Sequence, residues 1–315
     1  MRAATPLTPR VAPRFSAQSM GLALLLAVAG GLQAIALAWP WARGQDAGWL
    51  SLPGGYGRPL WWLQIVSLAV LAGALLAART RAGAAGRAML FATSWLAATF
   101  WWLFISMHTY GGLPAPLAVL AVLALAAFLG SYYALAAWAF AWCFNPGKHI
   151  GKHATRSRQA MVFAALWTLA ELARGWLWTG FPWGAGGYAH VEGPLAVLPR
   201  WLGVYGTGWV AAWLAAWLAL AWHGWRGQQR RPGMVAVLTG AALLALWPGL
   251  WQLREGALRS PDTSDARAPL SVDLLQGNIP QDEKFEMGSG VPLALDWYLQ
   301  NLRQAKAQLV VAPET

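Results

Sequence analysis

Residues 116–142 have the sequence PLAVLAVLALAAFLGSYYALAAWAFAW. This stretch has no charged residue and is longer than the roughly 17–25 residues that an α-helix needs to cross a bilayer. Hydrophobic residues make up 57 % of the 315-residue chain and charged residues only 11 %, whereas soluble domains carry about 25 % charged residues. The 23 tryptophans also indicate a membrane protein, because indole rings collect at membrane interfaces. We therefore predict an α-helical membrane bundle.

Other apolar runs along the chain are also long enough to span a membrane. The first could be a secretory signal, but it is longer than the ~7–15-residue core of such signals and further spans follow it, so an uncleaved span is expected. We predict seven spans at residues 20–39, 60–78, 88–107, 116–142, 160–178, 204–222 and 233–251.

The cationic residues between these spans predict the orientation. Thirteen Lys and Arg lie in the N-terminal segment and in the second, fourth and sixth loops, and three lie in the other loops (Arg43, Arg58 and Arg200). An excess of Lys and Arg marks the cytoplasmic side. We therefore place residues 1–19 in the cytoplasm, the spans and their loops within residues 20–252, and the tail outside. These cations sit in short loops, so the net charge of +11 indicates topology, and we expect no nucleic-acid binding.

The tail differs in composition from the body. Residues 253–269 form a polar linker, and residues 270–315 predict a buried strand at 270–275, a helix from Pro292 to about Ala307 and a second strand at 309–312. A strand–helix–strand unit of this size makes the two strands parallel. One helix cannot cover both faces of a parallel pair, so we expect a truncated domain that continues beyond Thr315. The apolar stripe of the helix comprises Leu295, Tyr298, Leu299 and Leu302.

Three features could carry chemistry. Glu314 follows an apolar strand and a proline, where a carboxylate suits general-base work or is simply a solvated loop residue. Glu171 and Arg174 lie on one helical face within a span, where they form either a buried structural ion pair or part of a polar cavity. The glycine- and aromatic-rich loop at residues 179–194 could form an irregular lining beside a cavity.

Metal and cysteine chemistry have little support. His149 and His153 have the spacing of a ligand pair but lack a third ligand, so we predict no metal. The single cysteine, Cys143, excludes a disulfide framework. His108, His190 and His223 stand alone and indicate no catalytic triad.

Several ordered motifs resemble those of the apolipoprotein N-acyltransferases, bacterial inner-membrane enzymes that complete lipoprotein maturation. The matching residues are Ile105 and Ser106, residues 110–116 (YGGLPAP), 171–176 (ELARGW), 179–183 (TGFPW), 187–188 (GY), 192–194 (EGP) and 276–281 (QGNIPQ), Lys284, and residues 312–315 (APET). Each motif is weak alone, whereas the ordered set is specific.

The resemblance implies eight spans with a nitrilase-like αββα domain in the periplasm, of which residues 270–315 would be the beginning. It implies ping-pong transfer of an acyl chain from a phospholipid to the amino group of a diacylglyceryl-cysteine on an apolipoprotein, with membrane lipid as surroundings and without a cofactor. Glu314 would be the base of a Glu–Lys–Cys triad whose lysine and cysteine lie beyond Thr315. Cys143 would lie at the cytoplasmic side and could not replace that cysteine.

The resemblance also implies substrate-binding residues. We expect Phe285, Glu171, Arg174, Phe181, Trp183 and Tyr188 to contribute to substrate binding. The family usually has tryptophan at the positions of Phe285 and Ala312, so the acyl-chain or headgroup preference is expected to differ. Two other classes stay open: a membrane-anchored amidase of the nitrilase superfamily, and a small-solute transporter, for which internal repeats would be expected.

Overall fold

The computed structural model describes residues 17–38, 57–144, 156–226, 270–279 and 290–313. The chain divides into two compact units, which are described separately. The first comprises residues 1–102 and 119–254, and the second comprises residues 103–118 and 255–315.

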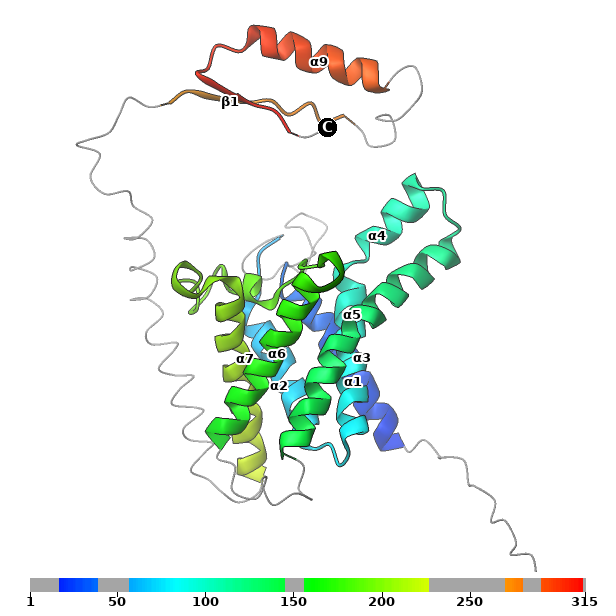
Figure 1. The fold of residues 1–315 in the computed structure, drawn as a ribbon, viewed down its shortest axis with the longest axis vertical. Coiled ribbons are helices and arrows are strands. Elements are labelled where there is room, and N and C mark those ends of the chain that lie inside the picture. The colour runs from blue at the N-terminus through cyan, green and yellow to red at the C-terminus, as the bar shows by residue number, and fades with distance from the viewer. Residues whose placement is uncertain (1–16, 39–56, 145–155, 227–269, 280–289, 314–315) are drawn as a thin grey trace, which may run out of the picture. The chain divides into compact units, whose positions relative to one another are not determined.

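The first unit is a bundle of helices that lie side by side (Figure 1). Helix α1 packs against α3 and α2, and α7 packs against both α2 and α6. Gly30 lets α1 approach α3 closely, because a Cβ at this position would collide with the carbonyl oxygen of Phe91. The helices are α1 (Ala17–Ile35), α2 (Trp61–Leu76), α3 (Arg81–Thr99), α5 (Ala115–Phe144), α6 (Arg156–Trp176) and α7 (Pro199–Arg226).

Four helical segments in the described part of the chain are long and apolar enough to cross a membrane: α1, α5, α6 with its extension to Thr179, and α7 up to His223. They confirm helices at four predicted spans, 20–39, 116–142, 160–178 and 204–222. Helix α2 is shorter, with 16 residues. The predicted span at 233–251 lies outside the described residues, so the count of seven stays a prediction.

The predicted span at 88–107 is not one continuous helix. Helix α3 begins at Arg81, because the Thr80 side chain accepts a hydrogen bond from the Gly83 backbone N–H (3.0 Å) and caps the helix. The helix ends at Thr99, whose hydroxyl donates to the Trp95 carbonyl oxygen (2.9 Å), a bond that favours bending. The chain then turns by 54° into α4 (Trp102–Ile105) and the π-helical η2 (Ser106–Tyr110), so this pair is at most a broken span.

A column of buried aromatic side chains forms the core between α3, α5 and α6. The Trp167 ring stacks on Trp95 with 5.6 Å between centroids, and Tyr133 lies 4.7 Å from Trp167. Phe163 continues the column along α6, 6.3 Å from Trp167. Aromatic pairs at these separations add packing energy beyond the area that they bury, so the column fixes the three helices against each other.

In the second unit, β1 (Val272–Leu274) and β2 (Leu309–Val311) form a parallel pair joined through α9 (Gly290–Gln304). The predicted parallel strand–helix–strand arrangement is thus confirmed. Helix α9 contacts the strand end through Tyr298, whose hydroxyl accepts a hydrogen bond from the Gly277 backbone N–H (3.2 Å).

The burial predicted for the strand at residues 270–275 was wrong. Leu274 in the predicted buried strand is 75 % exposed, because α9 covers only one face of the strand pair. Leu295, Leu299 and Leu302 of the predicted helix stripe are also exposed. Helix α9 instead buries Ala294 and partly buries Trp297 and Tyr298. Apolar residues are therefore exposed both on the strand face that α9 does not cover and on the outer side of α9.

Candidate functional site

The last two turns of α6 bring two ionisable side chains into the bundle interior. Glu171 is fully buried, and Arg174 is 1 % exposed. Both lie on the inner face of α6, as their spacing predicted, but the described residues show no ion pair between them. Of the two arrangements that the sequence left open, the direct ion pair is not seen, because each side chain instead binds backbone groups of the connection between α6 and α7.

Arg174 is held by three oxygen atoms and one aromatic face. Its Nη1 donates to the carbonyl oxygens of Phe181 (2.7 Å) and Trp183 (2.6 Å), and its Nε donates to the Tyr133 hydroxyl (3.1 Å). The guanidinium also lies 5.7 Å from the centre of the Trp95 ring. Its position near the C-terminus of α6 is favourable for a cation. Through its bonds to Phe181 and Trp183, Arg174 links the end of α6 to the segment that follows it.

Glu171 holds the next part of the same connection. Its Oε1 accepts a hydrogen bond from the Gly186 backbone N–H (2.9 Å), at the start of the 3-10 helix η5 (Gly186–His190). Its Oε2 has no hydrogen-bond partner among the described residues. A Cβ at Gly208 of α7 would lie 3.4 Å from this oxygen. Glu171 therefore sits where α6, α7 and η5 meet.

Neutral polar side chains that we did not single out in the sequence extend this cluster. Gln64 of α2 donates through Nε2 to the Gly186 carbonyl (3.3 Å), which leaves its Oε1 to accept from His190 Nε2 (2.7 Å). Burial lowers the pKa of His190, which lies between α6 and α7, to about 4, so the ring is neutral at pH 7. Gln33 of α1 is also fully buried. The sequence feature that could have identified Gln33 and Gln64 is an amide side chain inside each of two apolar runs, at residues 20–39 and 60–78.

The predicted aromatic residues of the loop occupy different surroundings. Phe181 is partly buried against Phe100, with 4.8 Å between ring centroids. Trp183 is 60 % exposed and contacts Trp102 (5.9 Å), and Tyr188 in η5 is 54 % exposed. The structure places all three on the connection between α6 and α7.

Other candidate residues fall elsewhere. Glu314, Phe285, His149 and His153 lie outside the described residues, so the structure does not test their roles. Cys143 is partly buried in the last turn of α5. No cluster of three potential metal ligands occurs among the residues that the structure describes.

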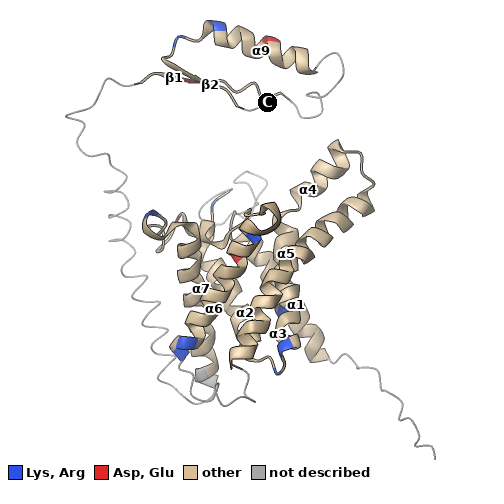
Figure 2. Cartoon of the chain, viewed as in Figure 1, with Lys and Arg blue, Asp and Glu red and all other residues tan. Residues whose placement is uncertain are grey.

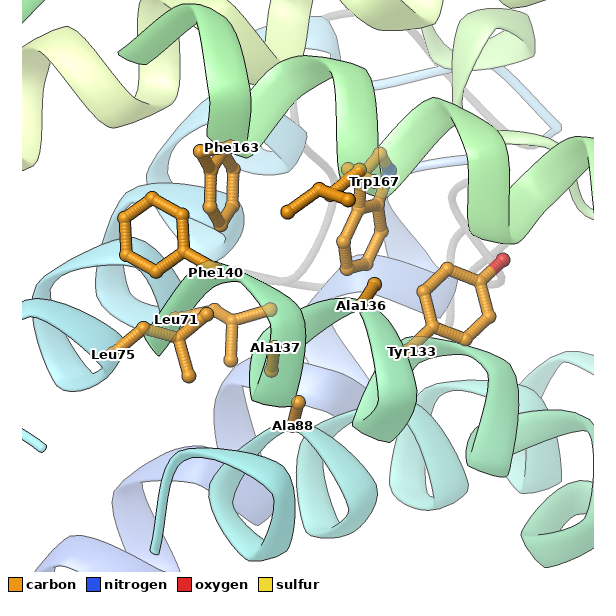
Figure 3. A pocket seen from close by; sticks show the side chains of 10 residues that line it. Leu71, Leu75, Ala88, Tyr133, Ala136, Ala137, Phe140, Phe163 and Trp167 are labelled. Atoms are coloured by element: carbon orange, nitrogen blue, oxygen red, sulfur yellow. The ribbon is translucent and has the colours of Figure 1, made fainter. Parts of the chain in front are cut away.

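A separate apolar pocket opens between α2, α3, α5 and α6 (Figure 3). Tyr133, Phe140, Phe163 and Trp167 line it together with leucine and alanine side chains. Its volume of about 10 Å³ is near the minimum for a single water molecule, which excludes an acyl chain in this conformation. The pocket is a packing defect beside the aromatic column.

Comparisons with known proteins find one family. A family model described as the apolipoprotein N-acyltransferase N-terminal domain matches residues 47–217. An apolipoprotein N-acyltransferase of Verminephrobacter eiseniae is 54 % identical over 294 residues, which are 91 % of this chain and 50 % of the relative. One of Ralstonia nicotianae is 40 % identical over 81 % of this chain and 45 % of its own length. One of Bordetella bronchiseptica is 38 % identical over 82 % of this chain and 48 % of its own length. The chain spans about half the length of these relatives.

Proposed function

The chain belongs to the apolipoprotein N-acyltransferase family, and we propose that it serves phospholipid-dependent N-acylation of the diacylglyceryl-cysteine of apolipoproteins. The observation that carries this proposal is the 54 % identity to an enzyme of that name over 91 % of the chain. The amidase and transporter alternatives have no comparable support.

We propose that the protein lies in the bacterial inner membrane with a cytoplasmic N-terminus and seven spans up to residue 252. The distribution of cations supports this orientation. Figure 2 shows ribbon segments in the Lys and Arg colour where α3 and α6 begin. A reporter that is active only in the periplasm should work when fused after Arg259 and stay silent when fused after Lys152. The reverse pattern would overturn the orientation.

We further propose that residues 270–313, with their parallel strands and single helix, begin a periplasmic nitrilase-like domain. The uncovered strand face and the exposed stripe of α9 support this, because parallel sheets are normally covered on both faces. The nucleophile and the triad lysine would then belong to the part of the relatives that this chain does not match.

In the proposed reaction, Glu314 takes the proton of a cysteine thiol. The thiolate attacks the ester carbonyl of a phospholipid, so that a thioester forms and the lysophospholipid alkoxide leaves as the alcohol after protonation. The α-amino group of the acceptor then attacks the thioester, and the thiol is released. Phe181, Trp183, Tyr188 and Phe285 would contact the lipid substrates. Glu171 and Arg174 would act through the connection that they hold.

A chimera tests the function. The part of the Verminephrobacter eiseniae relative that this chain matches is replaced by the corresponding residues of this chain. The chimera should restore N-acylated lipoproteins in a bacterium depleted of its own enzyme, and Glu314→Gln in the chimera should abolish the acyl-thioester at unchanged expression. A stable, membrane-inserted chimera without N-acylation would reject the assignment, and a surviving thioester would remove Glu314 from its role.

A further inference from the structure

Three consecutive residues after α6 have left-handed backbone angles. Trp178 has φ 57°, Thr179 has φ 78° and Gly180 has φ 78°. Glycine fits at position 180, where a Cβ would collide with the carbonyl of Gly175. A bulky residue such as Trp178 is an outlier in this region. Strained residues persist where the surrounding structure over-determines them, and they cluster at functional sites.

The constraint on this segment comes from Arg174. Its two hydrogen bonds to the Phe181 and Trp183 carbonyls fix the chain immediately after the strained residues. The Phe181 backbone N–H returns a bond to the Arg174 carbonyl (2.7 Å), and the Gly180 N–H donates to the Leu177 carbonyl (3.0 Å). The buried Arg174 side chain therefore holds the backbone of residues 178–180 in this conformation.

The strained segment presents indole rings outside the bundle. Trp176 is 84 % exposed and Trp178 is 81 % exposed. Where the connection enters α7, Trp201 is 78 % exposed, two residues before the break at Gly203. We call Trp176, Trp178 and Trp201 the tryptophan rim.

The position and charge of the rim indicate its partner. Its residues lie at the ends of two candidate spans, Arg156–Thr179 and Pro199–His223, where indole rings favour the headgroup layer. The Arg200 guanidinium lies 5.6 Å from the centre of the Trp201 ring. In the part of the chain that the structure describes, no carboxylate forms an ion pair with Arg200. A guanidinium beside exposed indoles complements a lipid phosphate.

We propose that the tryptophan rim binds the headgroup region of a glycerophospholipid and that Trp178 is a positioning residue for the phospholipid donor. The strained backbone sets the depth of the indole, and Arg174 maintains that backbone. The statement about the donor rests on the proposed acyltransferase function, whereas the lipid contact does not.

Depth measurements on residues 1–315 in phospholipid vesicles test the lipid contact. A bimane label on Trp178→Cys, in a Cys143→Ser background, should be quenched more strongly by nitroxides on lipid headgroups than by nitroxides deep in the acyl chains. Leu169→Cys, at an exposed position of α6 nine residues earlier, is the matched control and should show the opposite order. A label at position 178 that only aqueous iodide quenches, or that deep nitroxides quench best, would overturn the proposal.

Kinetics of the chimera test the positioning role. Trp178→Ala should raise the apparent KM for phospholipid by roughly tenfold, the factor that 1.4 kcal/mol corresponds to, at nearly unchanged kcat. The KM for a short water-soluble ester donor should not change. Trp178→Phe should recover most of the phospholipid affinity, and Leu169→Ala should behave like the unsubstituted chimera. Equal losses with both donors would refute the positioning role. An inactive unsubstituted chimera would refute the proposed function and leave the depth result to decide the lipid contact.

Discussion

Arg174 Nη1 lies 2.6 Å from the carbonyl oxygen of Trp183, nine residues further along the chain. The bond crosses from the last turn of α6 to the connection that leads to α7. Two backbone carbonyls and the Tyr133 hydroxyl, rather than the nearby Glu171 carboxylate, thus bind this buried cation, whose Nη2 has no partner among the described residues. Glu171 binds the Gly186 N–H in the same manner, so two charges on one helix hold two points of one connection.

Replacing Arg174 should destabilise the bundle. Arg174→Met removes the donors to the Phe181 and Trp183 carbonyl oxygens and leaves these partly buried acceptors unpaired, at a cost of about 1–3 kcal/mol. Thermal unfolding in detergent should show a clearly lower midpoint. Arg174→Lys keeps the positive charge but lacks the several donors of the guanidinium group. Its unfolding midpoint should therefore lie between those of the unsubstituted protein and Arg174→Met. Because the two side chains bind different backbone groups, adding Glu171→Gln should not restore stability. A double variant as stable as the original would mean that the pair is a simple ion pair after all.

The Tyr133 hydroxyl should contribute to the stability of the bundle, whereas the hydroxyl of the adjacent Tyr132 should not. Tyr133→Phe removes the acceptor of Arg174 Nε and should cost about 1–3 kcal/mol, because a buried charged donor is left unpaired. Tyr132→Phe removes the hydroxyl of the adjacent, partly buried residue and serves as the matched control. Chemical denaturation of both variants in the same detergent compares them. Equal midpoints would contradict a role for this bond.

A methyl group at Gly187 should disrupt the junction between η5 and α7. A Cβ there would collide with the Val204 carbonyl, and backbone atoms cannot move aside cheaply. Gly187→Ala should therefore reduce the yield of folded protein. Gly31→Ala in α1 meets nothing within 4 Å and should stabilise its helix by up to about 1 kcal/mol. Size-exclusion profiles and melting temperatures of the two variants distinguish them, and a monodisperse Gly187→Ala protein with the original midpoint would disprove the contact.

Acid should weaken the connection through His190. Its pKa is about 4 in the folded protein and about 6.5 in an unfolded chain, so the unfolded state binds more protons between these values. Stability is therefore fully present above about pH 6.5 and declines toward pH 4 by up to roughly 1.4 kcal/mol per pH unit. The Gln64 amide contacts the ring but does not titrate, whereas the Glu171 carboxyl, which binds the neighbouring Gly186, is a titratable group close to it. Unfolding measured from pH 7.5 to 4.5 should show this slope. His190→Gln should flatten it, and an unchanged slope in that variant would assign it to another group.

The sequence alone determined which segments form apolar helices and that the tail strands run parallel. Run length, charge content and turn residues are local properties, and the structure confirms them for residues such as those of α5 and for the pairing of β1 with β2. The sequence did not predict the break after α3, because the bond of the Thr99 hydroxyl to the Trp95 carbonyl, which favours bending, lies inside the apolar run at 88–107.

Only the tertiary structure decided how the polar groups pair. Helical spacing placed Glu171 and Arg174 on one face, but it could not show that their partners are backbone atoms of residues 181–186. Gln64 and His190 are 126 residues apart in sequence, and no periodicity connects them. In α9, Ala294 is buried and Tyr298 is partly buried, whereas the three leucines of the predicted stripe are exposed, and the Tyr298 hydroxyl accepts a bond from the Gly277 backbone N–H. A hydrogen bond or a packing contact depends on the positions of both partners, and sequence patterns describe only one element at a time.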